Sequence, residues 1–483
     1  MKKGVKLILV SIISFFLTCD ITNAATFNNI SKISIDNSQP LFDAIELDDG
    51  YIIYQSTYNN ENYNYNLSLT KITLDNKTEW TNTILVDPPG MSSWANGIQV
   101  SDDKAIIALY NETVIIDTKT GELKKENSEL MASEIREFKG NYILYSDTNT
   151  AFMIDADLNI LYKYNLDNEL HIEDIIVDND KIYILGSSST SVDGNYEYEY
   201  SLITLNSEFK EVERKTYSNG DKTDIFSSYT CTFQYGCVKN GNDFYCANHN
   251  IYKLSPDGKI SLTLGNFSNQ DNTGTGIIED DTTDYSTIKK IDDYLIATGY
   301  TIEDGKEYAF VEIYDLKFNL IKKINVNNHY NVPDGYFSVG KDLKPTKKGF
   351  MVLGGYHEFN KLDGTAFIAE YEMIYDIISK TDGNGNISSS KVSSPSGELI
   401  SFRVTPNAGY VLDYVKVTDA NGNVVTFTSN TFTMPSADVT IEAVFKRIVN
   451  PETATNIIGI ALVIMIIIGC TVVINKHKNN IKL

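Results

Sequence analysis

The feature that most constrains this chain is a short strand pattern that returns seven times between residues 27 and 372. Each copy begins with a polar turn rich in Asp, Asn or Gly and continues into a short apolar run, as in DDGYIIYQS from Asp48 and NDKIYILGS from Asn179. The other copies read SDDKAIIALY, KGNYILYSD, GNDFYCANH, DDYLIATGY and KKGFMVLGGY. Turn residues between short apolar runs are typical of strands joined in hairpins.

A second strand and a further polar turn follow each copy, and the copies recur at intervals of about 40–60 residues. Repeats of this length that hold about four strands are typical of propeller blades. Residues 27–372 therefore resemble β-propellers of the quinoprotein or kelch-like kind, which implies an all-β ring of roughly seven blades. The segment ISKISID from Ile30 would then pair into the last blade and remove a free edge. A β-solenoid and tandem sandwiches are the alternatives.

The composition changes at Met373, where a second small all-β domain is predicted over residues 373–446. This region is similar to the bacterial repeat domain related to the internalin B-repeat. The matching positions are Gly397, Pro406, Gly409, Tyr410, Gly422, Met434, Pro435, Asp438, Val439, Thr440, Ile441, Ala443 and Phe445. The resemblance implies a stalk of the kind found on Gram-positive surface proteins. Alternation in TFTMPSADVTIEAVF predicts one last strand over residues 431–445, with its apolar residues on one face.

The first residues have the order of a secretory signal peptide. Three lysines precede an apolar run of about eleven residues, which is too short to span a bilayer. Small residues follow, so we expect cleavage between Ala24 and Ala25 and removal of residues 1–24. Lipid attachment at Cys19 is the alternative.

At the other end, residues 457–474 form an uncharged apolar stretch that is long enough to span the hydrocarbon core as a helix. The tail at 475–483 is basic, which places it in the cytoplasm by the positive-inside rule. We therefore expect the chain between its two apolar segments to be exported, on the extracellular face of a Gram-positive-type cell.

The linker at 447–456 carries a short motif made of Asn450, Pro451, Glu452, Thr453 and Ala454. Followed by an apolar span and a basic tail, it resembles a sortase sorting signal of the LPxTG type. The resemblance implies a sortase partner, cleavage between Thr453 and Ala454, and attachment of the protein to the cell wall. A plain transmembrane anchor with a polar spacer is the alternative, in which the membrane itself is the partner.

The charge balance argues against nucleic acid as a partner. The chain has 64 acidic and 41 basic residues, for a formal net charge of −23. Such a chain repels phosphate backbones.

Three cysteines lie between the apolar ends, namely Cys231, Cys237 and Cys246. An odd number permits one internal disulfide and leaves a thiol. With His249 they allow a zinc set, although the paired spacing typical of zinc sites is missing. One disulfide, thiols alone and zinc all remain open.

No catalytic, cofactor-binding or metal-binding motif stands out. The sequence HEFNK from His357 begins like a zinc-protease motif, but Lys361 occupies the place of the second histidine. The loops at Asp382 and Asp419 resemble calcium loops without the late acidic ligand and are predicted to be turns. We therefore expect a surface-anchored binding or adhesion protein that recognises an extracellular glycan or protein. An extracellular polysaccharide-active hydrolase or lyase on the same scaffold is the alternative, favoured by carboxylates that converge at the channel.

Overall fold

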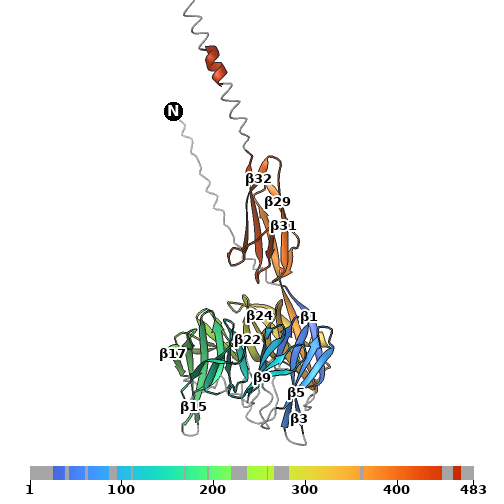
Figure 1. Ribbon diagram of the computed structural model, residues 1–483, viewed down its shortest axis with the longest axis vertical. Coiled ribbons are helices and arrows are strands. Elements are labelled where there is room, and N and C mark those ends of the chain that lie inside the picture. Colours follow the sequence, from blue (N-terminus) through green and yellow to red (C-terminus); the bar gives the residue numbers. More distant parts are fainter. Residues whose placement is uncertain are drawn as a thin grey trace, which may run out of the picture. The chain divides into compact units, whose positions relative to one another are not determined.

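The computed structural model describes residues 26–448 and 461–468 (Figure 1). Gaps within the first range fall at 39–42, 60–63, 86–94, 110–111, 147, 168–169, 193–194, 219–235, 258, 266–281 and 359–363. The chain divides into two compact units, one spanning Thr26–Ile374 and one containing Tyr375 and the residues after it. The predictions for the signal peptide and the sorting motif lie outside the described residues.

The described part of the first unit contains six four-stranded antiparallel sheets and a seventh set of four antiparallel strands, which belongs to a larger sheet. Their first strands are β2 (Ala44–Leu47), β6 (Ala95–Ser101), β10 (Glu134–Phe138), β14 (His171–Asp178), β18 (Gly236–Asn240), β22 (Thr283–Ile291) and β26 (Tyr336–Pro345). Their second strands are β3 (Gly50–Asn59), β7 (Lys104–Leu109), β11 (Asn141–Tyr145), β15 (Lys181–Val192), β19 (Asp243–Asn248), β23 (Tyr294–Glu303) and β27 (Gly349–Glu358). These second strands contain the seven repeated apolar runs.

The third strands are β4 (Asn64–Thr73), β8 (Glu112–Asp117), β12 (Thr150–Ile154), β16 (Asn195–Leu205), β20 (Asn250–Leu254), β24 (Lys306–Asp315) and β28 (Gly364–Thr381). The fourth are β5 (Thr78–Leu85), β9 (Leu123–Asn127), β13 (Ile160–Asn165), β17 (Glu211–Ser218), β21 (Ile260–Leu264), β25 (Leu320–Asn325) and, in the last sheet, β1 (Thr26–Ser38). A single helical turn, α1 (Asn327–Tyr330), precedes β26.

A hydrogen-bonded turn joins the third and fourth strands and recurs along the chain. The Asp155 carboxylate accepts the backbone N–H groups of residues 157 and 159, both at 2.9 Å, and Asp315 accepts those of residues 317 and 319 at 2.8 Å. The turn places Leu158 at φ 59° and Phe318 at φ 64°, a conformation that costs a non-glycine residue about 1–2 kcal/mol. Leu158 is fully buried, so its apolar contacts offset that cost.

Neighbouring sheets pack face to face through separate apolar cores. One core joins the first sheet to the second through Leu69 and Ile107, and others follow between successive sheets. A further core joins Ile53 of the first sheet to Leu353 and Ile368 of the last. Because the last sheet packs on the first, the sheets close into a ring, and the first unit is a seven-bladed β-propeller. The predicted fold class is confirmed.

The ring closes through the N-terminal strand. β1 pairs antiparallel with β28, with Ile33 opposite Ile368, and the Ile33 side chain is fully buried. The prediction that the segment from Ile30 completes the last blade is confirmed. The pairing covers the edge that β28 would otherwise expose.

The second unit holds the end of β28 with β29 (Gly385–Ser389), β30 (Ser393–Pro395), β31 (Leu399–Pro406), β32 (Tyr410–Asp419), β33 (Thr431–Thr433) and β34 (Val439–Arg447). β34 pairs in parallel with β28 and antiparallel with β32, whereas β33 pairs with β31. The predicted single strand over residues 431–445 is therefore wrong, because the chain changes sheet near Pro435. Within β34 the predicted alternation is confirmed, since Val439, Ile441, Ala443 and Phe445 are all buried.

The predicted turns at Asp382 and Asp419 are confirmed as turns. The Asp382 carboxylate accepts the backbone N–H of Asn384, and that of Asp419 accepts the backbone N–H of Asn423 at 2.8 Å. Beyond this unit, residues 461–468 are α-helical. Within the described residues, no helix is both long and apolar enough to cross a bilayer.

Candidate functional site

A cavity of about 600 Å³ is lined by the first strand of every sheet in the propeller. Its walls are residues 44–46, 96–99, 134–137, 174–178, 237–239, 289–291 and 342–345, with Met351. Since the first strands surround the axis of the ring, this cavity is the central channel. Its lining includes six carboxylates and five cationic side chains, a more even balance than that of the chain as a whole.

Strand register places polar residues at one level of the channel. Asn96, Glu134, Asp174 and Asp342 each lie opposite the fifth residue of the following strand. Asp43, which comes directly before β2, occupies the equivalent place in the first sheet. This set of five is called the acidic layer below.

Three cations lie two residues further along their strands, and they are called the basic layer below. Arg136 follows Glu134, Lys344 follows Asp342, and Lys289 occupies the matching position on β22. Because side chains alternate along a strand, residues two apart lie on the same face, about 6.6 Å from each other along the strand. The channel therefore carries an acidic layer beside a basic layer.

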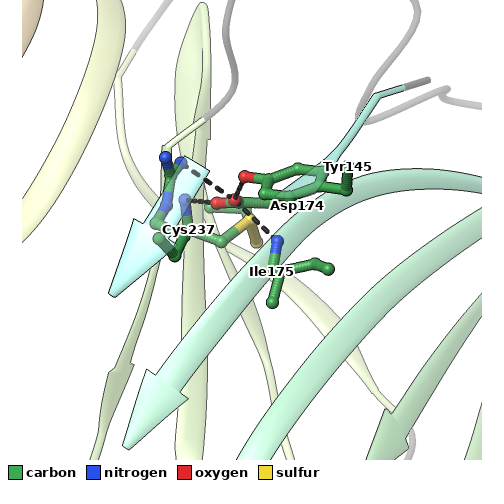
Figure 2. Close-up of a disulfide and its surroundings, with 6 residues drawn as sticks. Tyr145, Asp174, Ile175 and Cys237 are labelled. Carbon is green, nitrogen blue, oxygen red and sulfur yellow. Dashed lines mark hydrogen bonds and ion pairs between the residues drawn. A yellow bond between two sulfur atoms is a disulfide. The ribbon is translucent and has the colours of Figure 1, made fainter. Parts of the chain in front are cut away.

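Asp174 is a buried brace between three successive blades. Its Oδ1 accepts hydrogen bonds from the Tyr145 hydroxyl at 2.6 Å and from its neighbour's backbone, Ile175 N–H, at 2.7 Å, and its Oδ2 accepts one from Cys237 N–H at 2.8 Å on the next blade (Figure 2). Arg136 also approaches it, with Nη2 at 3.4 Å. Both of its oxygens are hydrogen-bonded within the protein, so Asp174 has a structural role.

Asp43 makes a similar brace at the point where the ring closes. One oxygen accepts the Ala44 N–H at 2.8 Å and the other accepts the Gly97 N–H of the second blade at 2.7 Å. The Lys344 ammonium group of the last blade forms an ion pair with this carboxylate. Burial lowers the pKa of Lys344 to about 7.

Glu134 is the one member of the acidic layer with a buried oxygen left unsatisfied. Its Oε2 accepts from Arg136 at 2.8 Å and from Asn96 at 3.2 Å, whereas Oε1 is buried with no hydrogen-bond partner among the described residues. The side chain is 11% exposed. An unsatisfied buried carboxylate oxygen costs several kcal/mol or requires a donor from outside the protein. Burial raises the pKa of Glu134, and the nearby Asp342 carboxylate adds to the effect.

Asp342 and Lys289 complete the channel. The Asp342 carboxylate accepts the Leu343 N–H at 2.8 Å, and burial raises its pKa. Lys289 forms no ion pair with any described residue. Its positive charge opposes the rise that burial causes in the pKa of both Glu134 and Asp342. These three side chains therefore act on one another electrostatically within one cavity.

A second pair of titratable groups lies nearer the start of β22. His249 Nδ1 is 2.7 Å from Asp284 Oδ2, and His249 also forms a β-bridge with Tyr285. Lys341 is buried nearby, which lowers its pKa to about 8, although the Asp284 carboxylate opposes this shift. The sequence analysis placed His249 only in a possible zinc set, and only the fold pairs it with Asp284.

Two of the three cysteines form a disulfide. Cys237 and Cys246 lie directly opposite each other on β18 and β19, with their Cα atoms 4.1 Å apart. Their sulfur atoms are therefore not zinc ligands, and Cys231 lies outside the described residues. In the described part of the chain, no group of three or more His, Cys, Asp or Glu side chains is arranged to hold a metal ion.

The site residues predicted from sequence, Ala24, Ala25 and the motif at 450–454, all lie outside the described residues. Sequence reasoning missed the channel residues, because each is an ordinary polar residue near a turn in a chain with 64 acidic side chains. A retrospective signal exists, since Asp43, Glu134, Asp174 and Asp342 each lie seven residues before the start of the second strand of their repeat.

Comparison with known proteins identifies the C-terminal domain. Residues 375–449 match the family model of the divergent InlB B-repeat domain. No curated protein matches the chain. Among solved structures, the chain is similar to BamB from Moraxella catarrhalis, with a TM-score of 0.37, 10% identity, and 72% of this chain and 100% of that chain covered. It is also similar to Raptor from Chaetomium thermophilum, with a TM-score of 0.44, 10% identity, and 73% of this chain but 29% of that chain covered.

The propeller assignment rests on the sheet topology, since these structural similarities are distant. The protein is an all-β chain that joins a seven-bladed propeller with a polar central channel to a bacterial B-repeat domain.

Proposed function

We propose that this protein is a cell-surface binding protein whose propeller holds its ligand in the central channel. The B-repeat domain supports a surface location, because this family is typical of bacterial surface proteins. The Cys237–Cys246 disulfide supports it as well, since disulfides persist mainly in oxidising, extracytoplasmic compartments.

The observation that carries the proposal is the unsatisfied Glu134 Oε1 in a cavity of about 600 Å³. A cavity of this volume is in the usual range for small-molecule sites, and such sites combine apolar walls with a few convergent polar groups. Here Ile98, Ile135 and Ile175 supply apolar wall, and Glu134, Lys289 and Asp342 supply the convergent polar groups.

The part of this proposal that concerns surface attachment is based on the sequence. Residues 1–24 direct export, residues 457–474 retain the chain at the membrane, and a sortase transfers Thr453 to the cell wall. The Thr453→Ala variant should remain in the detergent-extractable membrane fraction, while the wild-type protein should need a wall hydrolase for release. If detergent extracts both proteins equally, the anchor is the membrane and the sorting step is wrong.

Binding is tested by probing arrays of glycans, host proteins and short peptides with the full-length chain. A ligand held in the channel should be lost in the Glu134→Gln variant, which removes the charge with little change in shape. The matched control is Glu208→Gln, at an exposed turn of the fourth blade. Equal binding by both variants places the ligand outside the channel, and the absence of any bound probe contradicts a binding function.

The alternative function is a polysaccharide hydrolase or lyase, and one observation favours it. Glu134 and Asp342 are two buried carboxylic acids in one cavity, and each has a raised pKa. Perturbed acids of this kind are typical of general acid–base pairs. Release of reducing ends or unsaturated products from extracellular polysaccharides, abolished by Glu134→Gln and by Asp342→Asn, would establish catalysis.

A further inference from the structure

The charges of the channel divide into those paired within the protein and those that are not. Arg136 pairs with Glu134 Oε2 and lies near Asp174, Lys344 pairs with Asp43, and Lys239 pairs with Asp178 at 2.7 Å. Both oxygens of Asp174 are also hydrogen-bonded by the donors described above.

Within the acidic and basic layers, three charged groups remain available after this pairing. They are the buried Oε1 of Glu134, the Asp342 carboxylate, which accepts only its neighbour's backbone N–H within the described residues, and the Lys289 ammonium group. Two are acidic and one is cationic, so both signs of charge are presented to one ligand.

We propose that the channel binds a zwitterionic ligand of short-peptide size. Its cationic group is held by Glu134 and Asp342, and its carboxylate is held by Lys289. This proposal rests on the proposed function, because it names the class of ligand for the same site.

Charge complementarity excludes ligands that carry only one sign of charge. An anion would satisfy Lys289 but would face the two acids, and a cation would satisfy the acids but would face Lys289. In a low-dielectric cavity, like charges repel strongly and an unpaired buried charge is costly. Only a ligand with both signs neutralises all three groups.

The walls favour a peptide over a sugar. No aromatic side chain is among the described lining residues, so the apolar face of a sugar ring finds no aromatic ring to stack on. Apart from the isolated bridge between Tyr285 and His249, each first strand pairs on one side only, with the second strand of its sheet. The other edge presents backbone groups toward the channel. Those that do not donate to the acidic layer, as Gly97 and Cys237 N–H do, match the alternating donors and acceptors of peptide groups. The volume of about 600 Å³ accommodates a few amino-acid residues.

The test uses calorimetric titration of the full-length chain with four forms of tri-alanine. One has both ends free, one is N-acetylated, one is C-amidated, and one is blocked at both ends. We expect the form with both ends free to bind most tightly, and blocking either end to weaken binding by at least tenfold.

Two variants assign the ends of the peptide. Lys289→Gln should weaken binding of peptides with a free carboxylate and leave binding of the C-amidated peptide unchanged. Glu134→Gln should weaken binding of peptides with a free amino group and leave binding of the N-acetylated peptide unchanged. Lys259→Gln, at an exposed turn away from the channel, is the charge-matched control and should bind as the wild type does.

The outcomes separate this inference from the proposed function. If the four peptides bind equally or not at all at millimolar concentration, the zwitterionic ligand is wrong. If a neutral oligosaccharide binds instead and Glu134→Gln abolishes that binding, the channel is still the binding site and only the ligand class fails. If no ligand responds to Glu134→Gln, the proposed function fails as well.

Discussion

Replacement of Asp174 by Ala is the sharpest test of the brace between the third, fourth and fifth blades. The carboxylate is 2% exposed and accepts three hydrogen bonds of 2.6–2.8 Å, two of them from other strands. Its removal leaves the Tyr145 hydroxyl and the Cys237 N–H without an acceptor, and leaves Arg136 beside one carboxylate in place of two.

The magnitude follows from these contacts. A hydrogen bond to a charged group contributes about 1.5–3 kcal/mol, and breaking a buried ion pair costs about 3–5 kcal/mol. Because the contacts share one carboxylate, their contributions do not add, and we expect Asp174→Ala to lower the free energy of unfolding by about 3–5 kcal/mol. For a unit of this size that corresponds to a fall in Tm of about 4–7 °C.

Urea unfolding followed by circular dichroism measures the effect, with Asp178→Ala as the control. Asp178 lies on the same strand, but its pair with Lys239 is partly exposed, so its removal should cost less than about 1 kcal/mol. Tyr145→Phe, which removes one donor, should cost about 1–2 kcal/mol. If Asp174→Ala is no more destabilising than Asp178→Ala, the brace does not hold the blades together and the reasoning is refuted.

Three further predictions concern ring closure, the disulfide and pH. Ile33→Ala should lower the free energy of unfolding in urea by about 2–4 kcal/mol, because Ile33 is fully buried. Ser34→Ala, on the exposed face of the same strand, should be nearly neutral. Equal effects of the two variants would contradict closure of the ring by β1. Replacing both Cys237 and Cys246 by Ser should lower the free energy of unfolding by about 2–3 kcal/mol. Peptide mapping of the wild-type protein without reductant should recover the two cysteines in one disulfide-linked peptide pair. Burial raises the pKa of the Glu134 carboxyl above its usual value of 4.5. Between the pKa of the unfolded chain and that of the folded chain, the folded chain keeps a proton that the unfolded chain has released. The free energy of unfolding should therefore fall as the pH rises between these two pKa values. Glu134→Gln should remove this part of the decline, and an unchanged pH profile would show that Glu134 does not titrate in this way.

Local sequence was sufficient for the fold class. Seven polar turns followed by apolar runs identified the second strands, because the hairpin signal depends on residues close together in the chain. The B-repeat pattern ending at Phe445 identified the second domain for the same reason. Alternation also gave the buried face of β34, but it could not show that the chain changes sheet near Pro435, since both strands keep the same period of two.

The channel site and the disulfide were decided by tertiary structure. Asp43, Glu134, Asp174 and Asp342 come from four different blades, and only the registers of their hairpins bring them to one level around the axis. Cys237 pairs with Cys246 because the β18–β19 register sets them directly opposite. Which carboxylates are braces and which keep an oxygen without a partner depends on the donors that the neighbouring blade supplies. Those donors include the backbone N–H groups of Gly97 and Cys237 and the Tyr145 hydroxyl, which lie far from the carboxylates in the sequence. Only the packing of successive blades brings them together.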